Sequence, residues 1–512
     1  MSSPRIKDAV FLILTQTATK GFTFISNQLL LRRITPEVFG VAAYFEFIIN
    51  TVLFFSREAE RMSIQRINDA DQKNVRQAVI NFGCLPFFLS LPIFVIVYLM
   101  QRSSSLYTDT ICKLDNFQVL LVILVALVQI ELLAEPFAAL NQFAVNLKAK
   151  SKAEGLAVFV KCVATVALII LIQKKSLSHV SHVFAFAVGH LAYALTIFVV
   201  YWSSSVTSFP IPKKLKDGRL LDRSTVPIWR SLSLQMIFKH LLTEGDTLLV
   251  SYLFTVSQQG VYSLISNYGS LLARLLFQPI EETLRVSMTK IISSKNADLK
   301  QSYEFMSTMT VFYTNLCVLV LLGGYTNGSF MLRCVLGNSA NWLGSDIYSM
   351  FPFYILYIPF MAFNGIFEAF LSSASTHKEI GRFSVFMSIL SIIVLTILYV
   401  LIGKLHMGIL GLIISNIINM TMRILYCLVF MSNFFKSKVG VKAGPLIRRL
   451  SNPVGLALSA FAAQYLILGH LMTETPREFI VSLAMCFVCL LGCVWNERGL
   501  LLSIFNKKTK SD

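Results

Sequence analysis

Charged residues are scarce in this sequence. Only 14% of the 512 residues are Asp, Glu, Lys or Arg, whereas 55% are hydrophobic. A soluble protein carries about 25% charged residues, so a soluble multidomain chain is excluded. The apolar residues fall in repeated runs of about 20, which is the length of a helix that spans the hydrocarbon layer of a bilayer. The composition therefore predicts an all-α polytopic membrane protein.

Sequence motifs of common enzymes are also missing. There is no Walker phosphate-binding loop, no HExxH metal motif and no GxSxG nucleophile motif, so ATP-driven transport or hydrolysis by those devices has no support. The loops are short, whereas a membrane glycosyltransferase usually adds a substantial catalytic loop or domain. We therefore predict a protein that is not an enzyme and that needs no cofactor or metal.

About fourteen segments have the length and apolarity of membrane helices. We place them at residues 9–31, 38–56, 77–100, 117–140, 154–173, 182–203, 228–253, 260–280, 303–324, 347–371, 383–402, 407–431, 453–470 and 479–495. Lys and Arg are concentrated in alternate loops, with 30 on the side of the N-terminus and 9 on the other side. Positive loops remain in the cytosol, which predicts that both termini are cytosolic. The same rule accounts for the net charge of +18 without nucleic acid as a partner.

Two basic linkers divide the predicted helices into groups. We predict an N-terminal six-helix lobe (1–203), a basic cytosolic linker (204–227), a C-terminal six-helix lobe (228–431), a second basic linker (432–452), two extra transmembrane helices (453–495) and a cytosolic tail (496–512). The lobes look like copies. Gly40-Val41 and Gly260-Val261 open corresponding helices, and Glu135-Pro-Phe and Glu368-Ala-Phe recur in the same order. Such a pattern predicts parallel repeats, as in some transporter folds.

Ionisable residues interrupt the apolar helices, where each costs about 2.5–3.5 kcal/mol at the bilayer centre on insertion scales. The cations within predicted helices are Lys20, Lys161, Arg230, Lys239, Arg274 and Arg423. These groups must form pairs, snorkel to an interface or line a polar cavity. Arg and Lys in both halves favour an anionic ligand such as phosphate. Internal pairing, of Lys239 with Glu244 or of Lys161 with Glu135, is the alternative.

Several stretches of the sequence resemble a known family. They are Phe55-Ser-Arg-Glu-Ala59, Glu131-Leu-Leu-Ala-Glu-Pro-Phe137, residues 242–282, Asn364-Gly365 with Glu368, and Asn419 with Met422-Arg423. Together they resemble the eukaryotic Rft family of endoplasmic-reticulum proteins. The resemblance implies the fold of multidrug and toxin extruders and lipid II flippases, with two pseudo-symmetric six-helix lobes around a central cavity. It also implies movement of dolichol-pyrophosphate-linked oligosaccharide from the cytosolic to the lumenal leaflet for protein N-glycosylation.

The resemblance further implies the residues of a site. Arg57, Lys161, Arg274 and Arg423 match charged positions of the family pattern, as does Glu244, and the internal repeat adds Lys20 and Lys239. We expect these cations to hold the pyrophosphate, with Glu135, Glu244 and Glu368 as cavity acids and pairing partners. Membrane lipids of the endoplasmic reticulum and other N-glycosylation proteins are the further expected partners. A non-transporting accessory protein and a small-molecule antiporter remain alternatives.

Two short motifs bear on location. The tail Lys508-Thr-Lys510-Ser-Asp512 resembles the cytosolic dilysine signal that retrieves membrane proteins to the endoplasmic reticulum. Asn327-Gly-Ser329 is a glycosylation sequon that is predicted to lie just outside a helix, on the lumenal side.

Overall fold

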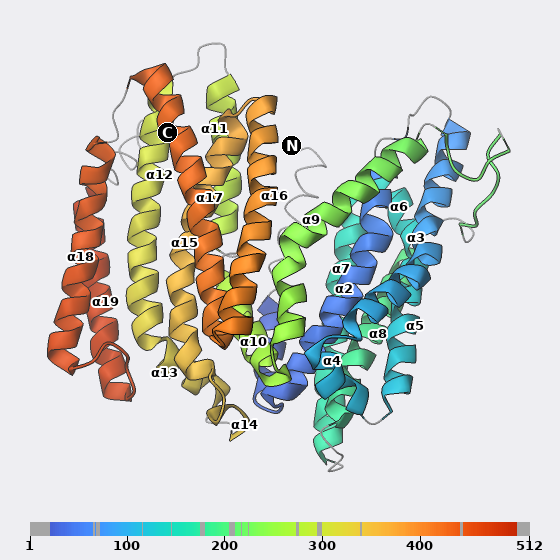
Figure 1. Cartoon of the computed structure of the whole chain (residues 1–512), viewed down its shortest axis with the longest axis horizontal. Coiled ribbons are helices and arrows are strands. Elements are labelled where there is room, and N and C mark those ends of the chain that lie inside the picture. Colours follow the sequence, from blue (N-terminus) through green and yellow to red (C-terminus); the bar gives the residue numbers. More distant parts are fainter. Residues whose placement is uncertain are drawn as a thin grey trace. The chain divides into compact units, whose positions relative to one another are not determined.

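The chain folds as helices, as its composition predicts. A computed structural model describes residues 21–64, 67, 72–114, 116–144, 146–174, 180–203, 210–216, 218–223, 225–272, 276–293, 299–337, 340–440 and 444–498. Within these ranges the chain forms helices and short connections and contains no strand (Figure 1).

The helices form two compact units, which we call the first and second units. The first comprises Met1–Gly260 with Ser339–Leu343, and the second comprises Val261–Asn338 with Gly344–Asp512. Helices of the first unit are α2 (Pro36–Ile64), α3 (Gln72–Gln101), α4 (Ser105–Asp109), α5 (Phe117–Leu133), α6 (Glu135–Phe143), α7 (Leu147–Lys174), α8 (Val180–Ser203), α9 (Thr225–Leu253) and α14 (Ala340–Leu343). Those of the second unit are α11 (Gln278–Ser293), α12 (Leu299–Val320), α13 (Thr326–Leu336), α15 (Ile347–Ala374), α16 (His377–Tyr399), α17 (Gly408–Val439), α18 (Gly444–Leu468) and α19 (Pro476–Asn496). The boundary falls within α10 (Val256–Leu272).

Eleven helices in the described part of the chain are long and apolar enough to span a membrane. The three predicted helices that are not among them are the most polar ones. The segment 9–31 is described only from residue 21, and 228–253 and 260–280 correspond to α9 and to α10 with the start of α11. The multi-pass architecture is therefore confirmed, whereas the count of fourteen remains a prediction.

The central helix of the first unit is α2, most of whose residues are buried, whereas Glu46 and Asn50 lie on an exposed stripe. It packs against α3, α5, α8 and α9, and 61% of its most apolar window is buried. Its burial and its contacts place α2 in the interior of the helix bundle of the first unit. By its contacts with α2, α9 belongs to the first unit. The lobe boundary that we predicted at residue 228 remains a prediction.

The repeat-related glycines Gly40 and Gly260 contact each other's helices at the junction of α2 and α10. A Cβ atom on Gly40 would clash with the Val256 carbonyl, and one on Gly260 would clash with the Pro36 carbonyl. Pro36 and Val256 are the first residues of α2 and α10. The contact is therefore reciprocal, and it requires the absence of a side chain on both helices.

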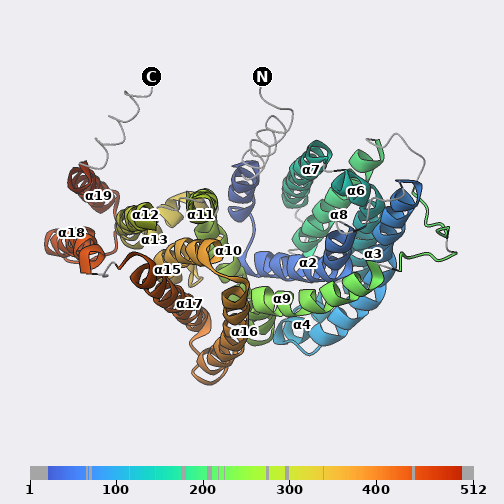
Figure 2. The same cartoon turned by 90° about the horizontal axis from the view of Figure 1, so that it is seen from above.

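In the second unit, α15 packs against α11, α12, α13 and α17. The hairpin of α18 and α19 lies beside α12 (Figure 2). The placement of Asn327 outside a helix was wrong, because a helical run continues from Leu299 to Leu336 through the π-helical turn η3 (Leu321–Tyr325). The polar Thr326 and Asn327 are accommodated in this run because Thr473 and Ser482 of the hairpin segment hydrogen-bond to them.

Candidate functional site

Two arginines project from one face of α2. Arg57 and Arg61 are four residues apart, a spacing that places side chains on the same side of a helix. The sequence predicted that this helix ends at residue 56, but α2 continues to Ile64. Within this helix the Ser56 and Ser63 hydroxyls donate to the carbonyls of Val52 and Ala59, each at 2.6 Å, so both hydroxyls have an acceptor. One continuous helix therefore carries both guanidinium groups.

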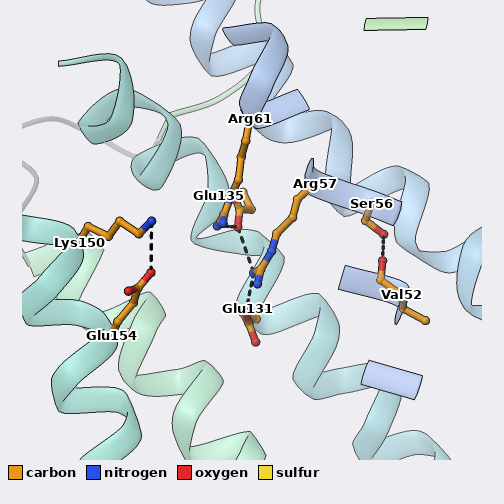
Figure 3. A network of polar contacts seen from close by, with 8 residues as sticks. All are labelled: Val52, Ser56, Arg57, Arg61, Glu131, Glu135, Lys150 and Glu154. Carbon is orange, nitrogen blue, oxygen red and sulfur yellow. Dashed lines mark hydrogen bonds and ion pairs between the residues drawn. The ribbon is translucent and has the colours of Figure 1, made fainter. Parts of the chain in front are cut away.

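Two glutamates meet these arginines where α5 ends and α6 begins. Figure 3 shows Arg57 between Glu131 and Glu135, with its Nη1 atom 2.6 Å from Glu131 Oε1 and 3.3 Å from Glu135 Oε1. Arg61 binds Glu135 in a bidentate manner, with Nε 3.0 Å from Oε2 and Nη2 2.5 Å from Oε1. We call Arg57, Arg61, Glu131 and Glu135 the four-residue ion network.

Burial separates the two kinds of residue in this network. The side chains of Glu131 and Glu135 are 8% and 5% exposed, whereas those of Arg57 and Arg61 are 22% and 26% exposed. Formal charges cancel, since two guanidinium groups face two carboxylates. Within the described part of the chain, Arg57 uses only Nη1 for these contacts, so its Nε and Nη2 groups remain available. An arginine held in this way can donate further hydrogen bonds to an anion.

A smaller cluster occupies the second unit. Arg423 on α17 donates from Nη2 to Glu368 Oε2 on α15 at 2.6 Å, and Asn364 Nδ2 donates to the same oxygen at 3.2 Å. Among the described residues, Arg423 Nε and Asn364 Oδ1 are buried without a hydrogen-bond partner. Buried polar atoms are normally satisfied. These two atoms are thus suited to a bound water or ligand group.

A glycine explains part of the motif around Asn364. The carboxyl group of Glu281 on α11 occupies the place that a Cβ atom on Gly365 would take. Glu281 therefore approaches the α15 backbone one residue after Asn364. The second unit consequently brings a further acid, which we did not select from the sequence, close to the Arg423 cluster.

Lys161 pairs with an acid different from the predicted one. Its Nζ atom on α7 lies 3.3 Å from Glu46 Oε1 on α2. The predicted pair of Lys161 with Glu135 is wrong, because Glu135 is bound by Arg57 and Arg61. Glu46 precedes Arg57 by about three turns of α2, so Lys161 belongs to a separate level of the first unit.

The structure describes the side chain of only one of the other predicted site residues. Glu244 is half-buried on α9. The Lys239 side chain and all of Lys20, Arg274, Lys508 and Lys510 lie outside the described residues, so the pair of Lys239 with Glu244 remains a prediction. No cluster of His, Cys, Asp and Glu in the described ranges is suited to a metal ion.

Arg61 and Glu131 complete the network but were absent from the predicted site. The sequence contained a signal for both residues in its spacing. Arg61 follows Arg57 by one helical turn, and Glu131 precedes Glu135 by one turn. Matched spacings of four residues on two helices allow paired contacts. The sequence did not show that these two helices are neighbours.

The chain matches one protein family along nearly its whole length. The model of that family, described as Rft protein, matches residues 5–507. A protein of Candida albicans, named Man(5)GlcNAc(2)-PP-dolichol translocation protein RFT1, is 36% identical over 98% of this chain and 95% of its own length. The protein of the same name from Saccharomyces cerevisiae is 36% identical over 98% of this chain and 96% of its own. One from Xenopus tropicalis is 26% identical over 89% and 87%.

Solved structures share the fold. Lipid II flippase MurJ, in an inward closed conformation, has a TM-score of 0.65 with 14% sequence identity, covering 96% of this chain and 100% of that chain. An inward-facing multidrug resistance transporter of the MATE family has a TM-score of 0.55 with 12% identity, covering 84% and 100%. At these identities the similarity establishes the polytopic fold alone.

Proposed function

This chain belongs to the Rft protein family, and we propose that it translocates dolichol-pyrophosphate-linked oligosaccharide between the leaflets of the endoplasmic-reticulum membrane for protein N-glycosylation. The observation that carries the proposal is the match along nearly the whole chain to relatives named for Man(5)GlcNAc(2)-PP-dolichol translocation. The polytopic fold that this chain shares with a lipid II flippase is of the kind that a membrane transporter needs. The direction is from the cytosolic to the lumenal leaflet, and the chain acts as a transporter rather than as an enzyme.

The pyrophosphate of the lipid is the group that the cations bind. We assign this role to Lys20, Arg57, Lys161, Lys239, Arg274 and Arg423, with Glu135, Glu244 and Glu368 as acidic partners. The available donors of Arg57 and the buried Nε of Arg423 support the assignment for these two residues. Bidentate guanidinium–phosphate contacts are strong and geometrically specific.

Partner exchange explains how paired arginines can bind and release an anion. Arg57 and Arg423 each contact a carboxylate, so each of these arginines is paired without substrate. A phosphate that takes the place of a carboxylate leaves the arginine paired throughout, which avoids the large cost of an unpaired charge in a membrane protein interior. Return of the carboxylate then displaces the phosphate, and transport requires this release as much as binding.

The location follows from the proposed cargo and from the charge distribution. Both termini are cytosolic in this proposal, and Lys508 and Lys510 return the chain to the endoplasmic reticulum. Its partners are the dolichol-linked lipid, the surrounding membrane lipids and other proteins of N-glycosylation.

Purified full-length protein in liposomes tests the proposal directly. Labelled dolichol-linked oligosaccharide should exchange between leaflets faster than in protein-free liposomes, and Arg423→Gln should slow this exchange while the protein remains folded. A lost charge-assisted hydrogen bond of about 1.5–3 kcal/mol corresponds to roughly ten- to hundredfold weaker binding. Lys150→Gln is the matched control, because it removes a cation from an exposed pair with Glu154.

An accessory role predicts another outcome. Folded protein that supports N-glycosylation in cells but produces no exchange in liposomes would refute translocation and would favour an accessory or lipid-chaperone protein. Exchange by the wild type that is unchanged in Arg423→Gln would retain the function and would remove Arg423 from the site.

A further inference from the structure

A cluster of hydrogen bonds fastens the linker before α9 onto α3. Asn81, which is 4% exposed, donates from Nδ2 to the carbonyls of Lys213 and Leu220 at 2.7 and 2.6 Å, and its Oδ1 accepts from the Lys213 amide at 3.0 Å. Gln77 donates to Asn81 Oδ1 at 2.8 Å and to the Ile211 carbonyl at 3.1 Å. One buried amide side chain therefore holds both arms of the linker.

The fastened segment is a compact hairpin. The Leu215 amide donates to the Arg219 carbonyl at 2.7 Å, and the Gly218 amide donates to the Leu215 carbonyl at 2.8 Å. Gly218 has φ 78°, a left-handed conformation that favours glycine. Leu215 and Leu221 pack against the buried side chains of α3. We call residues 210–223, with Asp217 outside the described ranges, the basic hairpin.

The outer face of the basic hairpin is cationic and apolar. Exposed cations on it are Lys213, Lys214, Lys216, Arg219 and Arg223. Ile211 and Leu220 are 57% and 53% exposed. The acid described in this segment, Asp222, is directed elsewhere, because its carboxylate accepts hydrogen bonds from the amide and hydroxyl of Thr225 at the start of α9. The face therefore combines positive charge with exposed apolar side chains.

The basic hairpin lies at the end of a membrane span. Its contacts are with Gln77, Asn81 and Cys84, which lie near the beginning of the span Val75–Gln101. Cys84 Sγ is 3.7 Å from the Pro210 carbonyl. A surface loop attached at this level is placed where lipid headgroups meet the hydrocarbon layer.

We propose that the basic hairpin is a binding site for the headgroups of anionic phospholipids in the adjacent leaflet. Lys and Arg near an anionic membrane surface contribute about 1 kcal/mol each, and apolar side chains that reach the headgroup boundary add to the binding. Basic loops that serve only to orient helices need charge but no fixed conformation. The buried Asn81 and the left-handed Gly218 instead give this loop a defined shape. The test of this site needs no transport.

Lipid titration of the full-length protein tests the site. In detergent micelles, phosphatidylserine should bind to the wild type more tightly than phosphatidylcholine, as measured by native mass spectrometry. The quadruple variant Lys213→Gln, Lys214→Gln, Arg219→Gln, Arg223→Gln should bind phosphatidylserine at least about a hundredfold more weakly at low salt, since each cation contributes about fivefold. Replacement of Lys213 and Lys214 by arginine should preserve binding, because it keeps the charge.

A matched control variant distinguishes the effect of the basic hairpin on lipid affinity from the effect of total charge. Replacement of Lys150, Lys152, Lys436 and Lys438 by glutamine removes four exposed cations from other loops and helix ends, and it should change phosphatidylserine affinity less than about threefold, because these cations lie outside the hairpin at varied distances. An equal loss in both quadruple variants would mean that affinity follows net charge, which would overturn the proposal.

Two further variants test the folded shape. Gly218→Ala strains the turn without a change in charge or in α3, and Asn81→Ala releases both arms. Each should weaken phosphatidylserine binding by about tenfold, which a turn strain of roughly 1–2 kcal/mol would produce. Unchanged affinity in Gly218→Ala would overturn the proposal. So would inorganic pyrophosphate that competes fully with the lipid at micromolar concentration, because the site would then be a free-phosphate site.

Discussion

The two units contain related acids that meet their arginines differently. Glu135 and Glu368 occupy corresponding Glu-x-Phe motifs, yet Glu135 is held by two arginines from α2 and Glu368 by one arginine from α17. The Glu135 side chain is 5% exposed, and that of Glu368 is 32% exposed. The repeat thus determines where an acid lies, while the surrounding helices determine how firmly it is held.

This difference suggests a division of roles between the clusters. A buried acid with three hydrogen bonds from arginines leaves little freedom for exchange, so the four-residue ion network chiefly orders α2 against α5 and α6. Glu368 has one arginine, and that arginine retains a buried Nε without a described partner. The second cluster is therefore the better candidate for exchange of a carboxylate for a phosphate.

The largest expected effect comes from Glu135→Gln. This change leaves Arg61 without an acid and Arg57 with Glu131 alone, and breaking a buried ion pair from one side costs about 3–5 kcal/mol. Thermal unfolding in detergent should show a large loss of stability, and neutralisation of Arg61 in the same chain should restore part of it. Glu154→Gln is the control, because its exposed pair contributes at most about 1 kcal/mol. Equal melting temperatures for the two single variants would contradict the structural role.

Substitutions at the two glycines where α2 and α10 meet should reduce stability by similar amounts. Gly40→Ala and Gly260→Ala each insert a methyl group against a backbone carbonyl that cannot move aside easily, and such overpacking costs about 1–3 kcal/mol. Because the contact is reciprocal, the two losses in unfolding free energy should agree within about 1 kcal/mol. Gly455→Ala meets open space and should have no destabilising effect. A loss confined to one of the two positions would show that the crossing is not symmetric.

A smaller loss of stability and a change in binding are expected for Glu368→Gln. The acid is partly exposed, and Gln retains an acceptor for Arg423, so unfolding should change by about 1 kcal/mol. If Glu368 competes with phosphate for Arg423, its neutralisation should lower the half-saturating concentration of labelled lipid and should slow release in the liposome assay. A loss of stability as large as that of Glu135→Gln would instead make both clusters structural.

The fold could be predicted from the sequence further than the site could. Apolar runs and loop charge determine membrane helices directly, since each depends on local composition. Ion pairs depend on which helices are neighbours, and this explains why Arg57 was selected while Arg61 was missed. It also explains why Lys161 was assigned to Glu135 although it lies beside Glu46. For Asn327, the sequon motif did not reveal that residues more than 140 positions later would bury it.

The smallest expected effect concerns the sequon at Asn327. This residue belongs to a buried hydrogen-bond network of the second unit that contains no charged side chain. Asn327 is 1% exposed. Its amide nitrogen donates to the hydroxyls of Thr326 and Ser482 at 3.0 and 2.9 Å, and its oxygen accepts from Thr473 at 3.1 Å. A glycan on this nitrogen would separate α13 from the hairpin of α18 and α19. The folded protein should therefore be unmodified at Asn327, although the motif is complete.

Electrophoretic mobility shows directly whether Asn327 carries a glycan. Endoglycosidase treatment of the wild type should produce no shift, and Asn327→Gln should migrate with it. As a control, a sequon added after residue 512 and directed to the lumen by a fused helix should show that the cells glycosylate the chain. A glycan on most of the wild-type protein would contradict the buried network and would mean that α18 and α19 pack elsewhere.

The network around Asn327 should also tolerate Ser482→Ala, with a loss of only about 1 kcal/mol in the free energy of unfolding. This loss is far below that of Glu135→Gln, because the loss of a neutral hydrogen bond leaves no buried charge unpaired.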